Sequence, residues 1–269
     1  MIYLGSFGRM IGIKCPSSQS VQTADRHTFD QTLEGRVKAQ ARPRGRRTWS
    51  LQTSEATTPE QHTALSAFAE GYWGNGPFWF FSADAVVTNM LPPDNSRCAV
   101  LPSHASPSIS IAGPVQLPGG AWAPKSFRSI NPAANMWHSE IQGLPVTPGQ
   151  TVTVSAYAQG EGCRVYAFFT DATGAEVSRT PSPSVGVPSE LRRLSATAVV
   201  PAGAVAVGLY SIGTTRGAAP AVTLTDTVQP WSDGQGCSKA VVSSFSRDQT
   251  LAVVGRTYSN VSFTVTEVG

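Results

Sequence analysis

The stretch Thr151-Val152-Thr153-Val154-Ser155-Ala156-Tyr157-Ala158 decides the fold class of this chain. The two valines and Ala156 would share one side of an extended backbone, whereas the hydroxyl side chains and Tyr157 would share the other. A period of two over eight residues is typical of a half-buried β-strand rather than of a helix. The stretch therefore predicts a strand with an apolar inner face.

The same alternation recurs in the segments that follow: residues 163–170, 193–200, 205–212 and 222–228. Turn signals separate these segments: Pro148-Gly149, Thr173-Gly174 and Pro201-Ala202-Gly203. Short strands at regular spacing, divided by such turns, indicate a β-sandwich or jelly roll. The protein as a whole is thus expected to be all-β, with one packed helix in its outer part.

The part of the chain from residue 98 to residue 237 differs from its surroundings, with seven Lys/Arg balanced by seven Asp/Glu. Three further β-like stretches follow it, at residues 240–245, 251–254 and 261–268. Three strands make a poor domain alone, so we expect them to join the sheets of residues 1–97. The sequence therefore predicts a discontinuous β domain, 1–97 and 238–269, into which a jelly roll, 98–237, is inserted.

One helix is predicted after residue 57. Thr58 fits its N-cap, Pro59 its first position, and Gln61 completes a capping box. Its apolar stripe follows helical spacing and consists of Leu65, Phe68, Ala69 and Tyr72. Gly71 and Gly74 would end the helix. A single short stripe of this kind needs a β-sheet to pack against.

Two segments of the outer part suggest contacts with other subunits. The run Phe78-Trp79-Phe80-Phe81 places rings on both faces of a strand, which indicates either a core or a subunit interface. Residues 1–50 hold nine Lys/Arg against three Asp/Glu, whereas residues 51–97 hold one against five. The basic run that includes Arg44, Arg46 and Arg47 is either an exposed loop, a docking site for an acidic neighbour or a weak DNA contact.

The outer part resembles the distal tail and minor tail proteins of long-tailed phages of actinobacteria. The resemblance rests on the order of four motifs: Arg47-Thr48-Trp49-Ser50-Leu51, Gly76-Pro77-Phe78-Trp79-Phe80-Phe81, Thr88-Asn89-Met90-Leu91-Pro92 and Phe263-Thr264-Val265-Thr266-Glu267-Val268-Gly269. It implies a structural protein of the virion tail tip, assembled in the host cytoplasm. It also implies a ring, usually a hexamer, between the tail tube protein and the tip hub proteins, through which DNA passes unread.

The insert resembles a carbohydrate-binding-module jelly roll. The resembling stretch runs from Leu144 to Tyr157 and continues through Thr170-Asp171-Ala172-Thr173-Gly174 to Ala198-Val199-Val200-Pro201-Ala202-Gly203-Ala204. Strand parity places Tyr157, Tyr166 and Tyr210 with Arg164 opposite the apolar faces of their strands. If those strands share a sheet, the side chains would form a glycan-binding face bordered by Trp122 and Trp137, because aromatic rings stack on sugars. The alternative is that loops or a neighbouring protein cover them.

Other chemistries find little support in the sequence. None of the phosphate-binding, zinc-protease or serine-hydrolase motifs occurs, so we expect no enzyme and no cofactor. The four histidines are scattered, and Asp226 alone is a poor calcium site. A glycan-binding adhesin, or an accessory module of a cell-wall-active enzyme, remains the alternative function.

The apolar segments and the cysteines bear on the location of the protein. There is no apolar run of membrane-spanning length and no secretory pattern at the start, so we expect a cytoplasmic site of assembly. Cys98 and Cys237 lie at the two ends of the insert. A disulfide between them fits these positions, but cytosolic synthesis favours thiols.

Overall fold

The computed structural model describes residues 1–14, 16–24, 27–31, 34–41, 45–53, 58–101, 107–131, 143–184, 190–253 and 256–268. The chain forms two compact units. Unit 1 comprises Met1–Leu4, Ile11–Phe80 and Cys237–Gly269, and unit 2 comprises Gly5–Met10 and Phe81–Gly236. The sequence placed the first boundary after residue 97, whereas the structure places it after Phe80.

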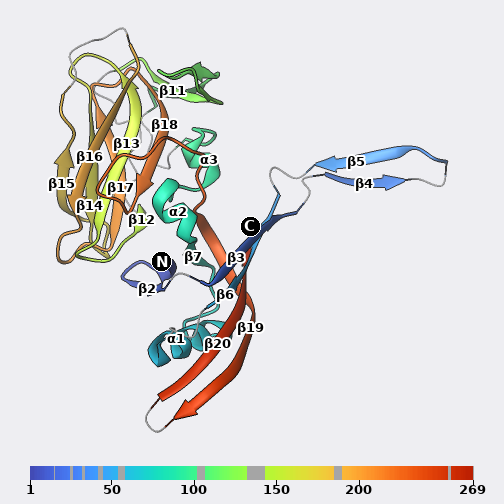
Figure 1. Cartoon of the computed structure of the whole chain (residues 1–269). Coiled ribbons are helices and arrows are strands. Elements are labelled where there is room, and N and C mark those ends of the chain that lie inside the picture. The colour runs from blue at the N-terminus through green and yellow to red at the C-terminus, as the bar shows by residue number, and fades with distance from the viewer. Residues whose placement is uncertain are drawn as a thin grey trace. The chain divides into compact units, whose positions relative to one another are not determined.

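Unit 1 is built on a seven-stranded sheet with the order β2-β1-β7-β19-β20-β6-β3 (Figure 1). Its strands are β1 (Ile2–Ser6), β2 (Arg9–Ile13), β3 (Ser18–Thr23), β6 (Arg47–Gln52), β7 (Phe78–Phe81), β19 (Cys237–Val253) and β20 (Arg256–Glu267). The two C-terminal strands lie between β7 and β6, so both ends of the sequence contribute to one sheet. They form two long strands rather than the three short ones expected.

The two faces of this sheet differ in chemistry. Phe263 lies opposite Leu51, and Val265 lies opposite Trp49. All four of these side chains are buried, and they form an apolar face. Their neighbours along the strands point to the other face and are mostly serine and threonine. The prediction of an all-β fold is confirmed.

Helix α1 (Pro59–Ala69) packs against β19. The predicted capping box is present, because the Thr58 hydroxyl accepts a hydrogen bond from the Gln61 backbone while the Gln61 side chain accepts one from the Thr58 backbone. Leu65 and Phe68 are buried as expected. The assignment of Tyr72 to the same stripe is wrong, because the helix ends at Ala69 and Tyr72 is 79% exposed.

His62 makes the stability of unit 1 dependent on pH. Its side chain is only 5% exposed, and its Nε2 has no hydrogen-bond partner among the described residues. Burial, and secondarily the positive charge of Arg247, lower the pKa of His62 below its ordinary value. Because the unfolded chain then binds a proton more readily than the folded one, this residue should reduce stability as the pH falls below about 6.5.

The His62→Gln variant should therefore lose less stability than the wild type between pH 7 and pH 5. Glutamine favours helix and carries no charge, so it removes the titration while keeping the helix. Urea unfolding at both pH values measures the difference. Parallel losses in the two proteins would contradict this assignment.

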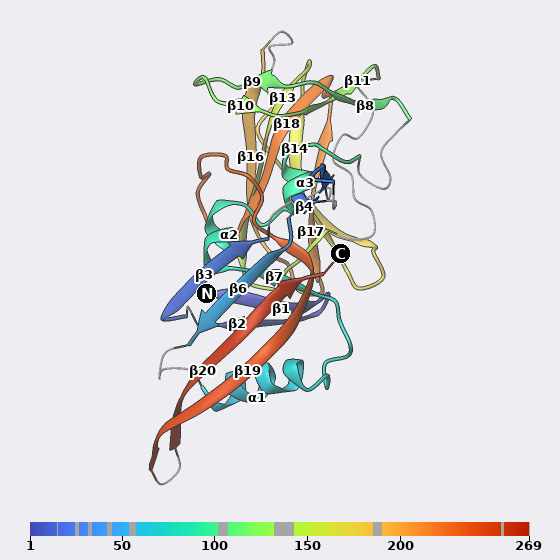
Figure 2. The same ribbon diagram turned by 90° about the vertical axis from the view of Figure 1, so that its right-hand side faces the viewer.

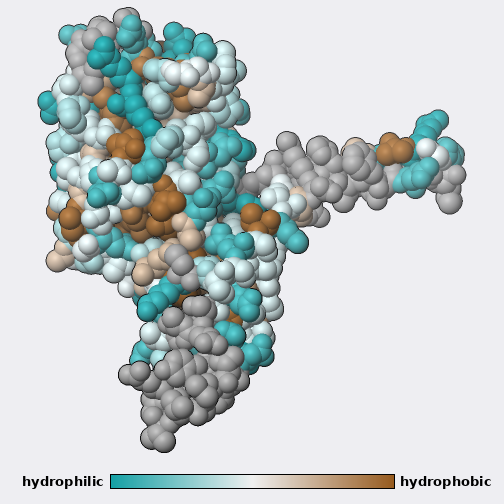
Figure 3. All heavy atoms as spheres, in the orientation of Figure 1, coloured by the Kyte–Doolittle hydropathy of each residue, from teal (hydrophilic) through white to brown (hydrophobic). Residues whose placement is uncertain are grey.

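Two hairpins of unit 1 extend without support from other strands. β4 (His27–Gln31) pairs with β5 (Val37–Ala41) in a sheet of their own (Figure 1). The described end of this hairpin has a mostly hydrophilic surface (Figure 3). The β19–β20 pair also continues beyond Ser262, the limit of β20 pairing with β6. An isolated hairpin is marginally stable in water, so the β4–β5 arm, whose sheet holds no other described strand, would gain stability from a partner.

Unit 2 is a β-sandwich (Figure 2). One sheet has the order β16-β13-β18-β11-β8 and the other β12-β17-β14-β15, with a small β10-β9 hairpin beside them. The strands of the two larger sheets are β8 (Ile109–Ala112), β11 (Ser126–Ser129), β12 (Leu144–Pro145), β13 (Thr151–Gln159), β14 (Arg164–Thr170), β15 (Glu176–Pro181), β16 (Arg192–Val199), β17 (Ala206–Ile212) and β18 (Arg216–Thr223). The hairpin consists of β9 (Val115–Gln116) and β10 (Trp122–Ala123). Val152, Val154 and Ala156 are buried, as their alternation predicted.

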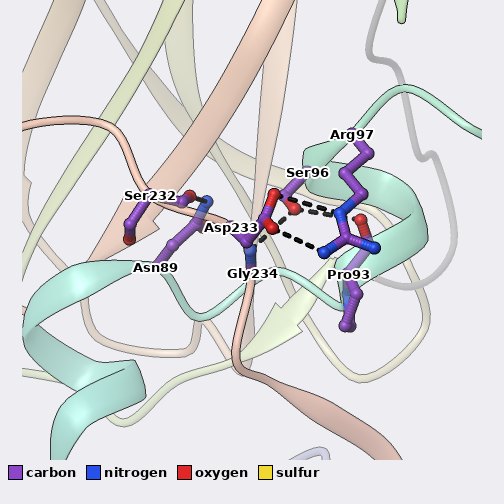
Figure 4. A network of polar contacts seen from close by, with 7 residues as sticks. All are labelled: Asn89, Pro93, Ser96, Arg97, Ser232, Asp233 and Gly234. Carbon is purple, nitrogen blue, oxygen red and sulfur yellow. Dashed lines mark hydrogen bonds and ion pairs between the residues drawn. The ribbon is translucent and has the colours of Figure 1, made fainter. Parts of the chain in front are cut away.

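The segments that enter and leave the sandwich are joined to each other. Helices α2 (Ala83–Thr88) and α3 (Pro93–Ser96) flank the entering segment and contact β18. Arg97 donates to Asp233 at 3.0 Å, and the backbone of Gly234 donates to the Ser96 hydroxyl at 2.7 Å (Figure 4). This contact holds the ends of the insert side by side. Cys98 and Cys237 are both buried thiols.

Candidate functional site

Tyr166 and Tyr210 form an aromatic pair on the four-stranded sheet of unit 2. They lie directly opposite each other in β14 and β17, and their ring centroids are 5.4 Å apart at an interplanar angle of 69°. Both rings are half-buried, and Arg164 is exposed two residues before Tyr166. Side chains two apart share a face, so three of the predicted glycan-binding residues lie on one surface.

Tyr157 does not belong to this surface. It lies in β13, in the five-stranded sheet, so the condition that the three tyrosine-bearing strands share one sheet is not met. Its ring packs against the β9–β10 hairpin, and the Arg193 guanidinium lies 5.8 Å from its centroid. The remaining candidate of this group, Trp137, lies outside the described residues.

A second surface, which the sequence did not single out, is an open depression of about 470 Å³ beside the β9–β10 hairpin. Its lining consists of Gln116, Leu117, Pro118, Gln159, Glu190, Leu191 and Arg216. These residues come from separate strands and loops of unit 2, so no contiguous motif marks them. The lining combines hydrogen-bond donors and acceptors with one arginine, which suits a polar ligand.

The basic run contributes less to the surface than predicted. Arg47 is buried, and its Nε lies 3.0 Å from Glu267 in an ion pair whose side chains are 10% and 4% exposed. Its guanidinium also lies 4.9 Å from the Trp49 ring centroid. Arg47 is therefore an internal residue rather than an exposed interface contact, which corrects the prediction. Arg46 is exposed, and Arg44 lies outside the described residues.

The aromatic run largely fills the core of unit 1. Phe78 packs edge-on against Phe68, with ring centroids 4.9 Å apart, and Phe80 lies 5.0 Å from Trp49. Both phenylalanines are buried, which favours the core interpretation for them. Trp79 is half-buried, so part of its side chain remains available at the surface.

The free edge of the unit 1 sheet is the clearest candidate for a contact with another subunit. β3 is the last strand in the order, and each of its six residues is exposed. Its sequence, Ser-Gln-Ser-Val-Gln-Thr, contains no charge and no proline. Beside it, serine and threonine side chains of β3, β6 and β20 line a shallow depression of about 350 Å³.

Within the part of the chain that the structure describes, His, Cys, Asp and Glu side chains do not gather in threes as a metal site would require. Among the same residues, no helix has the length and apolar character needed to cross a membrane.

The geometry thus defines an all-β protein that contains a β-sandwich module. No known family model matches the chain, and no curated protein matches it.

Solved structures resemble part of the chain. The CBM22-1–GH10 modules of endo-1,4-beta-D-xylanase 10B from Clostridium thermocellum, complexed with xylohexaose, are 16% identical, with 51% of this chain and 28% of that chain covered and a TM-score of 0.33. The enzymatically active domain of bacteriophage CBA120 tailspike protein 4 is 13% identical, with 50% and 21% covered and a TM-score of 0.36. The C-terminal family 22 carbohydrate binding module of Clostridium thermocellum Xyn10B is 14% identical, with 52% and 100% covered and a TM-score of 0.29. The chain thus spans 28% and 21% of the lengths of the first two structures.

Proposed function

We propose that this protein is a structural component of a phage tail tip, in which unit 1 assembles into a ring and unit 2 presents a glycan-binding surface. The order of the sequence motifs in the outer part supports the tail assignment. The observation that carries the assembly is the uncharged edge strand β3, each residue of which is exposed. The proposal assigns binding and assembly to this chain, and no catalytic step.

An unprotected edge strand favours association with another chain. Its unpaired backbone groups can hydrogen-bond to a second strand, and proteins that stay monomeric usually block such edges with lysine, proline or a bulge. The opposite edge of the same sheet is β2, which has a different sequence. Contacts between two unlike edges are heterologous, and they close into a ring when the rotation between subunits permits.

The hydroxyl-rich face of the sheet suits the inside of such a ring. DNA binds to proteins chiefly through lysine and arginine contacts with its phosphates. A face of serine and threonine offers no fixed positive charge, so DNA would pass it without being held. In the proposed ring, the depression lined by Ser20, Ser50 and Ser262 belongs to this inner surface.

The edge is tested by adding charge to it. We expect the wild-type protein to sediment as a closed assembly and the Gln19→Lys/Val21→Lys variant to sediment as a folded monomer, because charged edge residues oppose strand pairing. Val21 is 55% exposed, so lysine there should not disturb the core. Val228→Lys, at an exposed residue of unit 2, is the matched control and should assemble normally. Equal assembly of all three proteins would refute the edge contact.

A second candidate function is that of a monomeric glycan-binding adhesin, which the polar depression of unit 2 favours. The same sedimentation experiment separates the two proposals. A wild-type protein that remains monomeric at every concentration, and that binds glycans, would support the adhesin. Release of reducing ends from a polysaccharide would instead indicate an enzyme.

A further inference from the structure

Three arginines cross one face of the five-stranded sheet of unit 2. Arg193 lies opposite Tyr157, and Arg216 lies opposite Gln159. Arg128 lies opposite Arg216 in the next strand. Residues directly opposite in antiparallel strands point to the same side of the sheet, as do residues two apart in one strand. Arg128, Arg193 and Arg216, here called the arginine row, therefore share a face.

The arginine row lies on the outer face of the sandwich. Val154 and Ala156 alternate with Tyr157 along β13 and are fully buried, so they face the core between the sheets. The β9–β10 hairpin covers part of the outer face, where Val115 and Ala123 pack in one cluster with Ala218 of β18 (Figure 2). The depression of about 470 Å³ lies beside this hairpin and includes Arg216.

The charges of Arg128 and Arg216 are poorly compensated, whereas Arg193 donates to the Ser155 hydroxyl at 3.1 Å. Arg128 and Arg216 form no ion pair with any residue that the structure describes. The Nε atoms of Arg193 and Arg216 are buried and lack hydrogen-bond partners within the same residues. A buried cationic donor without an acceptor is costly. The acidic residue of the depression, Glu190, lies 3.9 Å from Arg192, so its charge is already partly matched.

We propose that this depression binds an acidic glycan, whose carboxylate or phosphate oxygens accept hydrogen bonds from Arg216 and Arg128. The guanidinium group suits both anions because its planar set of N–H donors can bind two oxygens at once. Gln116 and Gln159 offer amides to the sugar hydroxyls. This inference rests on the proposed glycan-binding role of unit 2, and adds the class of ligand and the place where it binds.

Trp122 extends the depression along the hairpin. It lies opposite Gln116 in the β9–β10 pair, so the two side chains point to the same side. Gln116 lines the depression, and the Trp122 ring is 61% exposed. A saccharide that leaves the depression past Gln116 would meet this ring, on which a sugar can stack. The site thus has a place for the anion and a place for the next sugar ring.

The test uses the full-length protein and isothermal titration with three polymers. These are polygalacturonate, its carboxyl-reduced neutral form, and a poly(glycerol phosphate) chain of the teichoic-acid type. We expect one acidic polymer to bind and the neutral polymer to bind at least tenfold more weakly. The polymer that binds identifies the anion as carboxylate or phosphate. Raising the salt concentration should weaken the interaction.

Variants then locate the site. Arg216→Gln should weaken binding of the acidic polymer about tenfold to a hundredfold, which is the usual effect of losing a hydrogen bond to a charged group. Arg128→Gln, at an exposed residue, should also weaken binding and leave folding intact. Arg179→Gln is the matched control, because this exposed arginine of β15 lies on the other sheet. Thermal melting confirms that each variant is folded.

Three results would overturn the inference: no binding of either acidic polymer, equal binding of neutral and acidic polymers, or loss of binding in Arg179→Gln but not in Arg128→Gln and Arg216→Gln. Sedimentation of the same samples distinguishes a failure of the acidic-glycan inference from a failure of the proposed tail function. A protein that assembles but does not bind acidic polymers would refute only the proposed class of ligand. A protein that binds acidic polymers but stays monomeric would refute only the proposed ring assembly.

Discussion

Replacing Glu267 by alanine should lower the free energy of unfolding of unit 1 by about 3–5 kcal/mol. Its carboxylate accepts hydrogen bonds from the Arg47 backbone at 3.3 Å and from Arg47 Nε at 3.0 Å. Both side chains are almost fully buried. Removal of Glu267 takes away the carboxylate that binds the buried Arg47 guanidinium, and breaking a buried ion pair costs more than losing a neutral hydrogen bond.

Peptide-resolved hydrogen exchange measures this effect separately for the two units. Protection should fall in peptides covering β6 and β20 and stay unchanged in those covering β13 and β14. Glu70→Ala is the matched control, because this exposed glutamate lies next to α1 in the same unit, where such changes usually alter stability by less than about 0.5 kcal/mol. A loss below about 1 kcal/mol in Glu267→Ala would show that the pair is not a buried ion pair in solution.

A double replacement separates the charge from the packing. Arg47→Met combined with Glu267→Leu removes both charges and keeps apolar volume, so it should recover most of the stability lost in Glu267→Ala. If the double variant is as unstable as the single one, the hydrogen bonds and the contact of Arg47 with Trp49 matter more than the isolated charge.

The Arg47–Glu267 pair illustrates what the sequence did not reveal. Arg47 belongs to a basic run, which is typical of an exposed loop, and its partner lies 220 residues further along the chain. Arg47 does share the period-two alternation of Trp49 and Leu51, which lie on the buried face of β6, but a charged residue in a basic run is not expected there. Only the pairing of β6 with β20 brings the two charges together, and that pairing joins the two ends of the chain.

Predictions that depend on neighbouring residues succeeded more often than predictions that depend on which distant strands pair. The strand at residues 151–158 and the capped helix were predicted because a period of two and a capping box depend on neighbouring residues. The assignment of Tyr157 failed because membership of a sheet depends on which strands pair. β13 pairs with β16 and β18, whereas β14 pairs with β15 and β17. The depression beside the hairpin was missed for the same reason.

Asn89, within the motif Thr88-Asn89-Met90-Leu91-Pro92, should be the most sensitive polar residue of unit 2. It is fully buried, and its side-chain amide donates to the Pro220 carbonyl at 3.1 Å. The same amide donates to the Ser232 carbonyl at 3.0 Å (Figure 4). Its side-chain oxygen accepts from the backbone N–H groups of Leu91 and Val222 at 3.2 and 3.3 Å. One side chain thus joins the entering segment, β18 and the leaving segment.

We expect Asn89→Ala to lower the free energy of unfolding of unit 2 by about 2–4 kcal/mol, because buried backbone groups lose their partners and each such group costs about 1–3 kcal/mol. Asn89→Asp should also destabilise, since a carboxylate keeps the acceptor but cannot donate to the two carbonyls. Asn95→Ala, in α3, is the control, with an expected loss below about 1 kcal/mol. Hydrogen exchange should show loss of protection in β18. If protection falls instead throughout both units, Asn89 stabilises the whole chain rather than the ends of the insert, and the interpretation of this motif as a local connection is wrong.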